Sequence, residues 1–213
     1  MPNIDSQFED KADSRIRLYR LLAGAYRYPD AEAVDEFHSG RWGKQVASLL
    51  KALGIEDDHP APRLSTSSED YEVEFLGLFE VGMGGAPCPL HSGYYSRDRM
   101  RDMEEVVRFF RFFGYQPQRT SDKFPDHLVF ELAFMAHLIG KGNAERDDAA
   151  SLRLAQRDFC TRHLASWLPS LRASIEQRAS VPFIKHVVRI TDELVANECR
   201  NLEEIVRGEL QDA

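Results

Sequence analysis

The chain has 213 residues, of which 43% are hydrophobic and 29% are charged, and its formal net charge is −8. This length and composition are ordinary for a soluble globular protein with one large domain. The negative charge argues against non-specific nucleic-acid binding, which depends on cations that neutralise phosphates. It leaves room for a cationic peptide partner, whose attraction to an acidic surface weakens with salt.

The three cysteines, Cys88, Cys160 and Cys199, are odd in number and widely spaced, so they do not indicate a disulfide framework. The N-terminal stretch MPNIDSQFEDKADSR lacks the basic start and apolar core of a secretory signal. No apolar run approaches the ~18 residues that a membrane-spanning helix needs. We therefore expect a protein of the reducing cytoplasm, without stable membrane insertion.

Apolar residues recur at helical spacing through most of the chain, and segments with the alternation of a strand are lacking. The predicted helices, in chain order, cover 14–29, 31–40, 41–54, 69–82, 96–115, 124–142, 144–168 and 181–206, while 170–179 is either a short helix or an irregular connection. The long loops at 55–68 and 82–96, rich in proline, glycine and serine, are the natural places for function.

Local signals support several of these boundaries. Gly54 suits a left-handed cap at the end of 41–54, and Gly114 ends the next strongly amphipathic segment, 96–115. The Ser67 and Ser68 hydroxyls can accept hydrogen bonds from the first amides of 69–82. Pro182 suits the first turn of the last helix.

The segment 96–115 carries an apolar stripe at steps of three and four residues, which predicts a core-facing side. The stripe consists of Met100, Met103, Val107, Phe110 and Phe113. With no internal repeat and no low-complexity linker, the sequence predicts a single all-α domain over 1–213, built from about eight or more helices and with a flexible segment at 1–13.

Enzyme signatures are weak. The glycine cluster GMGGAP has neither the lysine of a phosphate-binding loop nor a preceding strand. Cys88 and His91 have Cys-x-x-His spacing, and His59 could add a third zinc ligand, but no second close pair completes the site. A buried thiol and an exposed imidazole are the simpler interpretation, with a metal- or thiol-dependent enzyme as the alternative. A di-iron bundle needs Glu-x-x-His on two helices, whereas the sequence has this spacing once, at Glu56 and His59 in the predicted loop 55–68.

The segment FPDHLVFELAFMAHL predicts an amphipathic helix with a polar start. Pro125 fits a first turn, where its missing amide is not needed, and Asp126 there would meet the positive end of the helix dipole. His127 and Glu131 are four residues apart, so their side chains could touch. The core-facing stripe is Leu128, Leu132, Met135 and Ile139.

Aromatic residues near the second long loop have two interpretations. Phe75, Leu78 and Phe79 stand at helical spacing, which favours the core, although they could also line a groove for an apolar peptide. Tyr94 and Tyr95 could cover the core or stack on a ligand. From these residues alone the sequence describes a helical protein with a possible groove and leaves its function open.

The order of these motifs carries a resemblance. Over roughly residues 14–206, the chain resembles the TorD/DmsD/NarJ family of redox-enzyme maturation chaperones. The motifs that carry the resemblance are an aromatic-x-x-Leu-Phe (Phe75 to Phe79), a Gly/Pro loop closing on Tyr-Tyr-Ser, and Pro-Asp-His-Leu followed by Glu-Leu. The stretch LHSGYYSRDRMRDMEEVVRFFRFFGY is similar to the branch that serves type II enzymes of the dimethyl-sulfoxide-reductase family, such as ethylbenzene and dimethyl sulfide dehydrogenases and selenate or chlorate reductases. GAPCPLHSGYYS departs from the Pro-Tyr-Glu-Ser pattern of the nitrate-reductase branch.

The resemblance implies a cytoplasmic, all-helical chaperone that is not an enzyme and has no cofactor or metal of its own. Its partner would be the catalytic subunit of a molybdenum enzyme and its twin-arginine leader, held until the molybdenum cofactor is inserted. The expected state is a monomer or a homodimer, and a helical adaptor for a folded partner is the remaining alternative. The residues expected to bind peptide are Asp126, His127, Pro125, Tyr71, Phe75, Leu78, Phe79, Tyr94, Tyr95 and Glu131.

Overall fold

The computed structural model describes residues 11–56, 62–82, 85–117 and 124–211. Its α-helices are α2 (Ala12–Ala25), α3 (Ala31–Ser39), α4 (Arg41–Leu53), α5 (Ser68–Phe79), α6 (Arg99–Phe112), α7 (Leu128–Ala144), α8 (Ala149–Phe159), α9 (Leu168–Arg178) and α10 (Pro182–Gln211). Short helical turns are η1 (Ser92–Tyr94), η2 (Arg146–Asp148) and η3 (Cys160–Leu164). Within these ranges the only β-type pairing is an isolated bridge between His91 and His127, so the predicted all-α class is confirmed.

The local signals that predicted individual helix boundaries are also confirmed. The Ser67 hydroxyl accepts a hydrogen bond from the Asp70 amide at the start of α5, 3.1 Å away. Gly54 and Gly114 follow α4 and α6 with φ of +74° and +69°, a region that favours glycine. Pro182 is the first residue of α10. Of the segment 1–13, residues 1–10 lie outside the described ranges, and α2 already begins at Ala12.

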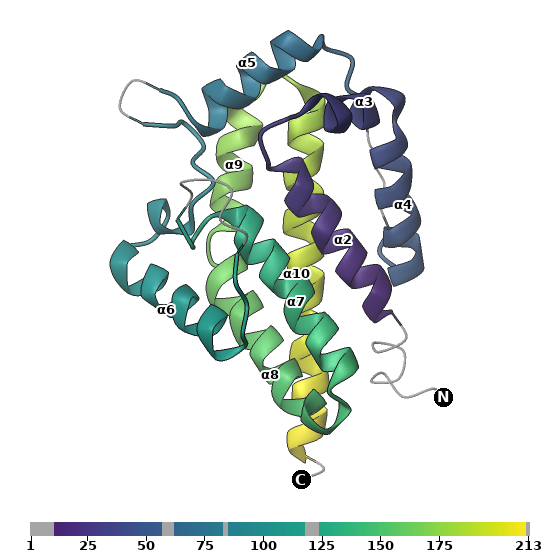
Figure 1. The fold of residues 1–213 in the computed structure, drawn as a ribbon, viewed down its shortest axis with the longest axis vertical. Coiled ribbons are helices and arrows are strands. Elements are labelled where there is room, and N and C mark those ends of the chain that lie inside the picture. The colour runs from purple at the N-terminus through teal and green to yellow at the C-terminus, as the bar shows by residue number, and fades with distance from the viewer. Residues whose placement is uncertain (1–10, 57–61, 83–84, 118–123, 212–213) are drawn as a thin grey trace.

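Helix α7 lies at the centre of the fold, packed against α2, α8 and η3 (Figure 1). Its predicted core stripe is confirmed, because Leu128, Leu132, Met135 and Ile139 are at most 2% exposed. The other faces of α7 are buried as well, through Val129, Phe134, Ala136 and Leu138. A helix that is apolar on every side can exist in water only when other elements surround it.

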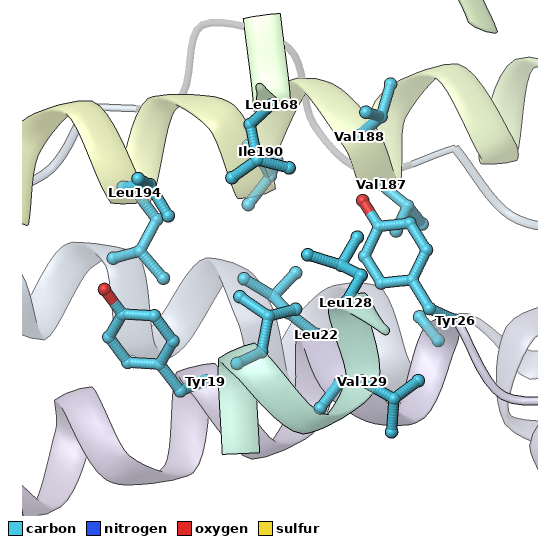
Figure 2. Close-up of a cluster of buried hydrophobic side chains, with 14 of the residues drawn as sticks. Tyr19, Leu22, Tyr26, Leu128, Val129, Leu168, Val187, Val188, Ile190 and Leu194 are labelled. Atoms are coloured by element: carbon cyan, nitrogen blue, oxygen red, sulfur yellow. The ribbon is translucent and has the colours of Figure 1, made fainter. Parts of the chain in front are cut away.

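Figure 2 shows how α2 and α10 enclose the start of α7: Tyr19, Leu22 and Tyr26 of α2 lie opposite Val187, Ile190 and Leu194 of α10, near Leu128. One of the two tyrosine hydroxyl groups of this apolar layer is hydrogen-bonded internally. The Tyr26 hydroxyl donates to Thr191 Oγ1 at 3.0 Å, and Thr191 donates in turn to the Val187 carbonyl at 2.8 Å. The layer therefore excludes water without leaving these hydroxyl groups unpaired.

A buried charged cluster also connects distant helices. Arg15 of α2 forms an ion pair with Glu198 of α10 and donates to Gln156 of α8 at 2.8 Å, and all three side chains are buried. Buried charges are costly unless they are paired and hydrogen-bonded. Helical spacing alone does not predict that an arginine of the first helix lies in the interior.

Several helix ends differ from the prediction. The helix expected to end near Gly140 or Gly142 continues to Ala144, and α8 packs against its end, where a Cβ at Gly142 would lie 3.5 Å from Leu152 Cβ. The helix expected over 144–168 is divided, since α8 ends at Phe159 and a π-helical turn follows at Cys160–Leu164. The segment 170–179 is helical, as part of α9.

The predicted stripe of α6 is only partly correct. Phe110 is buried and Phe113 is half-buried, but Val106 takes the second buried position in the helix, and Met100 is 61% exposed. Phe112 is 82% exposed. Since α6 lies at the edge of the bundle in Figure 1, it has fewer neighbours to cover it than a central helix has. Across the described residues, no helix is both long and apolar enough to cross a bilayer.

The central position of α7 predicts the effect of a core truncation. Leu132 is fully buried, so Leu132→Ala should lower the free energy of unfolding by about 2–5 kcal/mol through lost burial and a cavity. Val73 of α5 is 70% exposed, and Val73→Ala should change it by less than about 0.5 kcal/mol. Urea denaturation followed by circular dichroism measures both, and equal effects would contradict the assignment of α7 as the core.

Candidate peptide-binding site at the start of α7

The polar group at the start of α7 is arranged differently from the simple first-turn expectation. The helix begins at Leu128, so Pro125 and Asp126 precede it, and His127 is the capping residue. Nδ1 of His127 accepts a hydrogen bond from the Val129 amide at 3.1 Å. The expectation that Pro125 and Asp126 lie in the first helical turn is therefore wrong, because His127 supplies the acceptor that starts the helix.

Asp126 joins the start of α7 to the loop before α6. Its carboxylate is fully buried and accepts hydrogen bonds from His91 Nδ1 at 3.0 Å and from the Gly93 amide at 3.2 Å. Its carbonyl accepts from the Ser92 amide at 3.0 Å, and the Leu128 amide donates to the Leu90 carbonyl at 2.8 Å. We call these contacts between 90–93 and 126–128 the junction.

The junction keeps Asp126 ionised. Burial would raise the pKa of this carboxyl group, but the hydrogen bond and charge of His91, the Gly93 amide and the Arg99 charge together hold the pKa below its usual value. A carboxylate that accepts several hydrogen bonds is favoured in its charged form. The loop is therefore attached to α7 by a charge that persists through the neutral range.

Gly93 is required by the close packing of the junction. A Cβ at this position would lie 2.4 Å from Cγ of Arg99 and 2.9 Å from Oδ2 of Asp126. Neither group can move freely, since the carboxylate is held by His91 and the Cγ atom is near the Arg99 backbone. The glycine therefore allows the loop backbone to reach the carboxylate.

Glu131 lies one turn into α7 and is fully buried. The Trp167 indole donates to its Oε2 at 3.1 Å. Burial raises the pKa of Glu131 to about 8, against smaller lowering effects of the Ser92 hydroxyl and the Trp167 indole. At pH 7 this carboxyl group is mostly neutral, so it does not act as a charged contact for a peptide.

The surface above the junction carries two exposed aromatic rings. Tyr94 is 58% exposed and Phe124 is 54% exposed. The Arg99 guanidinium lies 4.6 Å from the centre of the Tyr94 ring and 5.8 Å from that of Phe124. The His91 ring lies close to both, with centroids 6.3 Å and 6.2 Å away. We call Tyr94, Phe124, Arg99 and His91 the aromatic surface.

The other expected peptide-binding residues lie inside the protein. Tyr71, Phe75, Leu78 and Phe79 of α5 are at most 6% exposed. Tyr71 packs edge-on against Phe37 and Phe183, at 6.0 and 6.1 Å. Tyr95 stacks on Trp167 at 5.2 Å and so covers the core, unlike its neighbour Tyr94. A peptide-binding role for these residues stays a prediction.

One contact links α5 to the junction. The Cys88 amide donates to the Leu78 carbonyl at 2.8 Å, which attaches the beginning of the loop to the end of α5. The structure thus brings Asp126, His127 and Tyr94 together around His91, which contacts each of them, whereas α5 is connected to the loop through the Cys88 backbone.

The metal- or thiol-dependent alternative finds little support. Cys88 is fully buried, and burial raises the pKa of its thiol, so it is a poor nucleophile. His91 is engaged with Asp126, and His59 lies outside the described residues. In the part of the chain that the structure describes, no group of three or more His, Cys, Asp or Glu side chains could hold a metal ion.

Sequence reasoning missed three members of this region: Arg99, Phe124 and Trp167. It considered His91 as a metal ligand, as a catalytic partner of Cys88 or as an exposed imidazole, and not as a partner of Asp126. Phe124 directly precedes Pro125 and could have been included by proximity. Arg99 and His91 both act on Asp126, which is 27 and 35 positions away in the chain. A single sequence does not reveal contacts over such separations.

Comparisons with known proteins agree with this architecture. The family model described as Nitrate reductase delta subunit matches residues 38–173. The selenate reductase assembly chaperone protein of Thauera selenatis is 38% identical over 172 residues, covering 78% of this chain and 79% of the relative. The chlorate reductase assembly chaperone protein of Ideonella dechloratans is 37% identical, covering 74% and 75%. The perchlorate reductase assembly chaperone protein of Dechloromonas aromatica (strain RCB) is 31% identical, covering 87% and 88%.

These matches define a maturation chaperone rather than an enzyme, as the resemblance implied. The chain belongs to the nitrate reductase delta subunit family, and it is similar to the assembly chaperones named above. The resemblance to the branch that includes chaperones of selenate and chlorate reductases is confirmed as well.

The tight packing at Gly93 predicts a selective destabilisation. Gly93→Ala should lower the free energy of unfolding by about 1–3 kcal/mol, because the added methyl group overpacks the junction. Gly77→Ala on α5 is the matched control, since a Cβ there meets nothing within 4 Å. It should raise the free energy of unfolding by up to about 1 kcal/mol through helix propensity. Changes of the same sign in urea denaturation would contradict this account.

Glu131 predicts a pH dependence. The folded protein keeps its proton up to about pH 8, whereas an unfolded glutamate releases it near pH ~4.3. The folded state therefore binds more protons between these values, and this residue lowers stability as the pH rises. Glu131→Gln keeps an acceptor for Trp167 and removes the titration. The free energy of unfolding of Glu131→Gln, relative to that of the native protein, should increase between pH ~5 and ~8 by at most about 1.4 kcal/mol per pH unit. Urea denaturation at several pH values measures this difference. A difference that stays constant with pH would contradict the assignment.

Proposed function

We propose that this chaperone binds the catalytic subunit of a dimethyl-sulfoxide-reductase-family molybdenum enzyme in the cytoplasm and retains it until its cofactor is inserted. The names of the relatives support the choice of client class, since they refer to selenate, chlorate, perchlorate and dimethyl sulfide oxidoreductases. The observation that carries the proposal is the aromatic surface held above the junction.

In this proposal the aromatic surface binds the N-terminal leader of the client. A twin-arginine leader combines two adjacent guanidinium groups with an apolar segment. The Arg99 guanidinium lies over Tyr94 and Phe124, so these ring faces can receive a guanidinium group, and a leader arginine would take this place by displacing Arg99. The apolar segment of the leader would contact the same exposed rings, and the net charge of −8 would attract the leader at long range.

Asp126 would act mainly from beneath this surface. Both of its oxygens are used in the junction, so its first role is to fix the loop that carries Tyr94, and its second is to supply negative charge. His127 would contribute by starting α7 at the correct residue. Pro125 and Glu131 would shape the same region, and Tyr71, Phe75, Leu78, Phe79 and Tyr95 would support it from the core.

The proposal is tested with a fluorescently labelled leader peptide that contains the paired arginines and the apolar segment. Tyr94→Ala together with Phe124→Ala should weaken its binding by about tenfold or more, as for central aromatic residues of an interface. Asp126→Ala should weaken it as well, through loss of the junction. Binding should fall as salt is raised.

Phe112→Ala is the matched control, because Phe112 is an aromatic residue of α6 with 82% exposure that lies outside the aromatic surface. It should leave the affinity for the leader peptide unchanged. Equal binding by the native protein, the Tyr94/Phe124 double variant and the Asp126 variant would disprove the site.

A further inference from the structure

A second surface, between α6 and α8, is separate from the junction. The hollow has a volume of about 710 Å³, within the range of about 300–1,000 Å³ for ligand sites. Its apolar lining includes Phe109, Phe112 and Phe113 from the α6 side and Leu154 and Ala155 from α8. We call it the α6/α8 groove. Phe112 is 82% and Leu154 is 41% exposed, which is unusual for large apolar side chains in one place.

The floor of the groove is supported by the core. Phe109 packs against Phe134 and Phe159 at 6.4 and 5.4 Å, and Phe113 lies 6.3 Å from Phe134. Phe112 lies edge-on to Phe113 at 4.9 Å and projects outward. An apolar partner would therefore meet a preformed surface that needs little ordering on binding.

The rim of the groove is positively charged, although the whole chain is acidic. Arg108 and Arg111 line it from α6. The negative charge of the nearby Glu105 is shared among three arginines, since its carboxylate lies 3.7 Å from Arg108, 3.7 Å from Arg101 and 2.7 Å from Arg162. Asp158, the one acidic residue of the lining, is paired with Arg157 at 2.7 Å. The local charge at the groove is therefore positive, which favours carboxylates on the partner.

The walls of the groove restrict the shape of the partner. Both walls are α-helices, whose backbone amides and carbonyls bond mainly within each helix. An extended peptide would find few backbone partners there, whereas a helix satisfies its own backbone. The groove therefore suits an amphipathic helix with large apolar side chains on one face and acidic residues beside them.

We propose that the α6/α8 groove binds an acidic amphipathic helix in the part of the client catalytic subunit that follows the leader. The leader does not suit this groove, because its paired arginines would face Arg108 and Arg111. This inference rests on the proposed function, which supplies the source of the helix. It adds a second surface that binds the client, and this surface prefers acidic segments whereas the aromatic surface binds the basic leader.

The chemistry of the groove is tested with two labelled synthetic helical peptides. Both carry leucines at helical spacing on one face, and the flanking positions are all Glu in one peptide and all Lys in the other. Fluorescence anisotropy should show at least tenfold tighter binding of the Glu peptide, with a preference that decreases as salt is raised. Phe112→Ala should weaken it at least tenfold, while Tyr94→Ala leaves it unchanged.

Charge reversal gives a readout that loss of packing would not produce. Arg108→Glu with Arg111→Glu should shift the preference to the Lys peptide, and an unchanged melting temperature for this variant would confirm that the fold is intact. Equal binding of both peptides by the native protein, or an unchanged preference after charge reversal, would overturn the proposal. Sedimentation that reveals a dimer lost in Phe112→Ala would also overturn it, since a second copy would then occupy the groove.

The client itself separates this proposal from the proposed function. The host's molybdoenzyme catalytic subunit, expressed without its leader, should bind the native chaperone and bind Phe112→Ala at least tenfold more weakly. Binding of the leader peptide without any binding of the leaderless subunit would overturn the groove assignment and leave the proposed function intact. Failure of both probes to bind would overturn the proposed function and, with it, the source assigned to the helix.

Discussion

The start of α7 lies inside the protein, and this constraint governs the whole candidate site. The first amides of a helix lack partners within the helix, so a buried helix start needs acceptors from other parts of the chain. Here His127 accepts from the Val129 amide, and the Leu90 carbonyl accepts from the Leu128 amide. Asp126 then draws the 90–93 backbone into place. His127 and Asp126 thus provide the hydrogen bonds that allow α7 to begin in the interior of the protein.

The features that the sequence could predict are those that depend on residues close together in the chain. Helical spacing predicted the helices and the core stripe of α7, and local chemistry predicted the cap at Ser67 and the left-handed turns at Gly54 and Gly114. These features depend on residues within a few positions of one another. The all-α class and the family followed from them, the class by pattern and the family by the order of its motifs.

The site was less accessible to sequence reasoning because its contacts are long-range. The pairing of His91 with Asp126, the position of Trp167 against Glu131 and the approach of α8 to Gly142 all arise from packing between distant segments. The α6 prediction failed for a related reason. Periodicity indicates which face of a helix is apolar, but only the neighbours of that helix decide whether the face is covered, as the exposure of Met100 illustrates.

Gly93 also provides a way to compare this chain with its relatives. The missing side chain at this position is what lets the loop backbone reach a buried carboxylate, so glycine here and aspartate two residues before α7 form one structural requirement. A family member that keeps both has the means to seat its loop as this protein does. A member with a larger residue at this position must seat its loop differently and will present another outer surface. An alignment inspected at these two positions can therefore sort family members by loop geometry before any client is known.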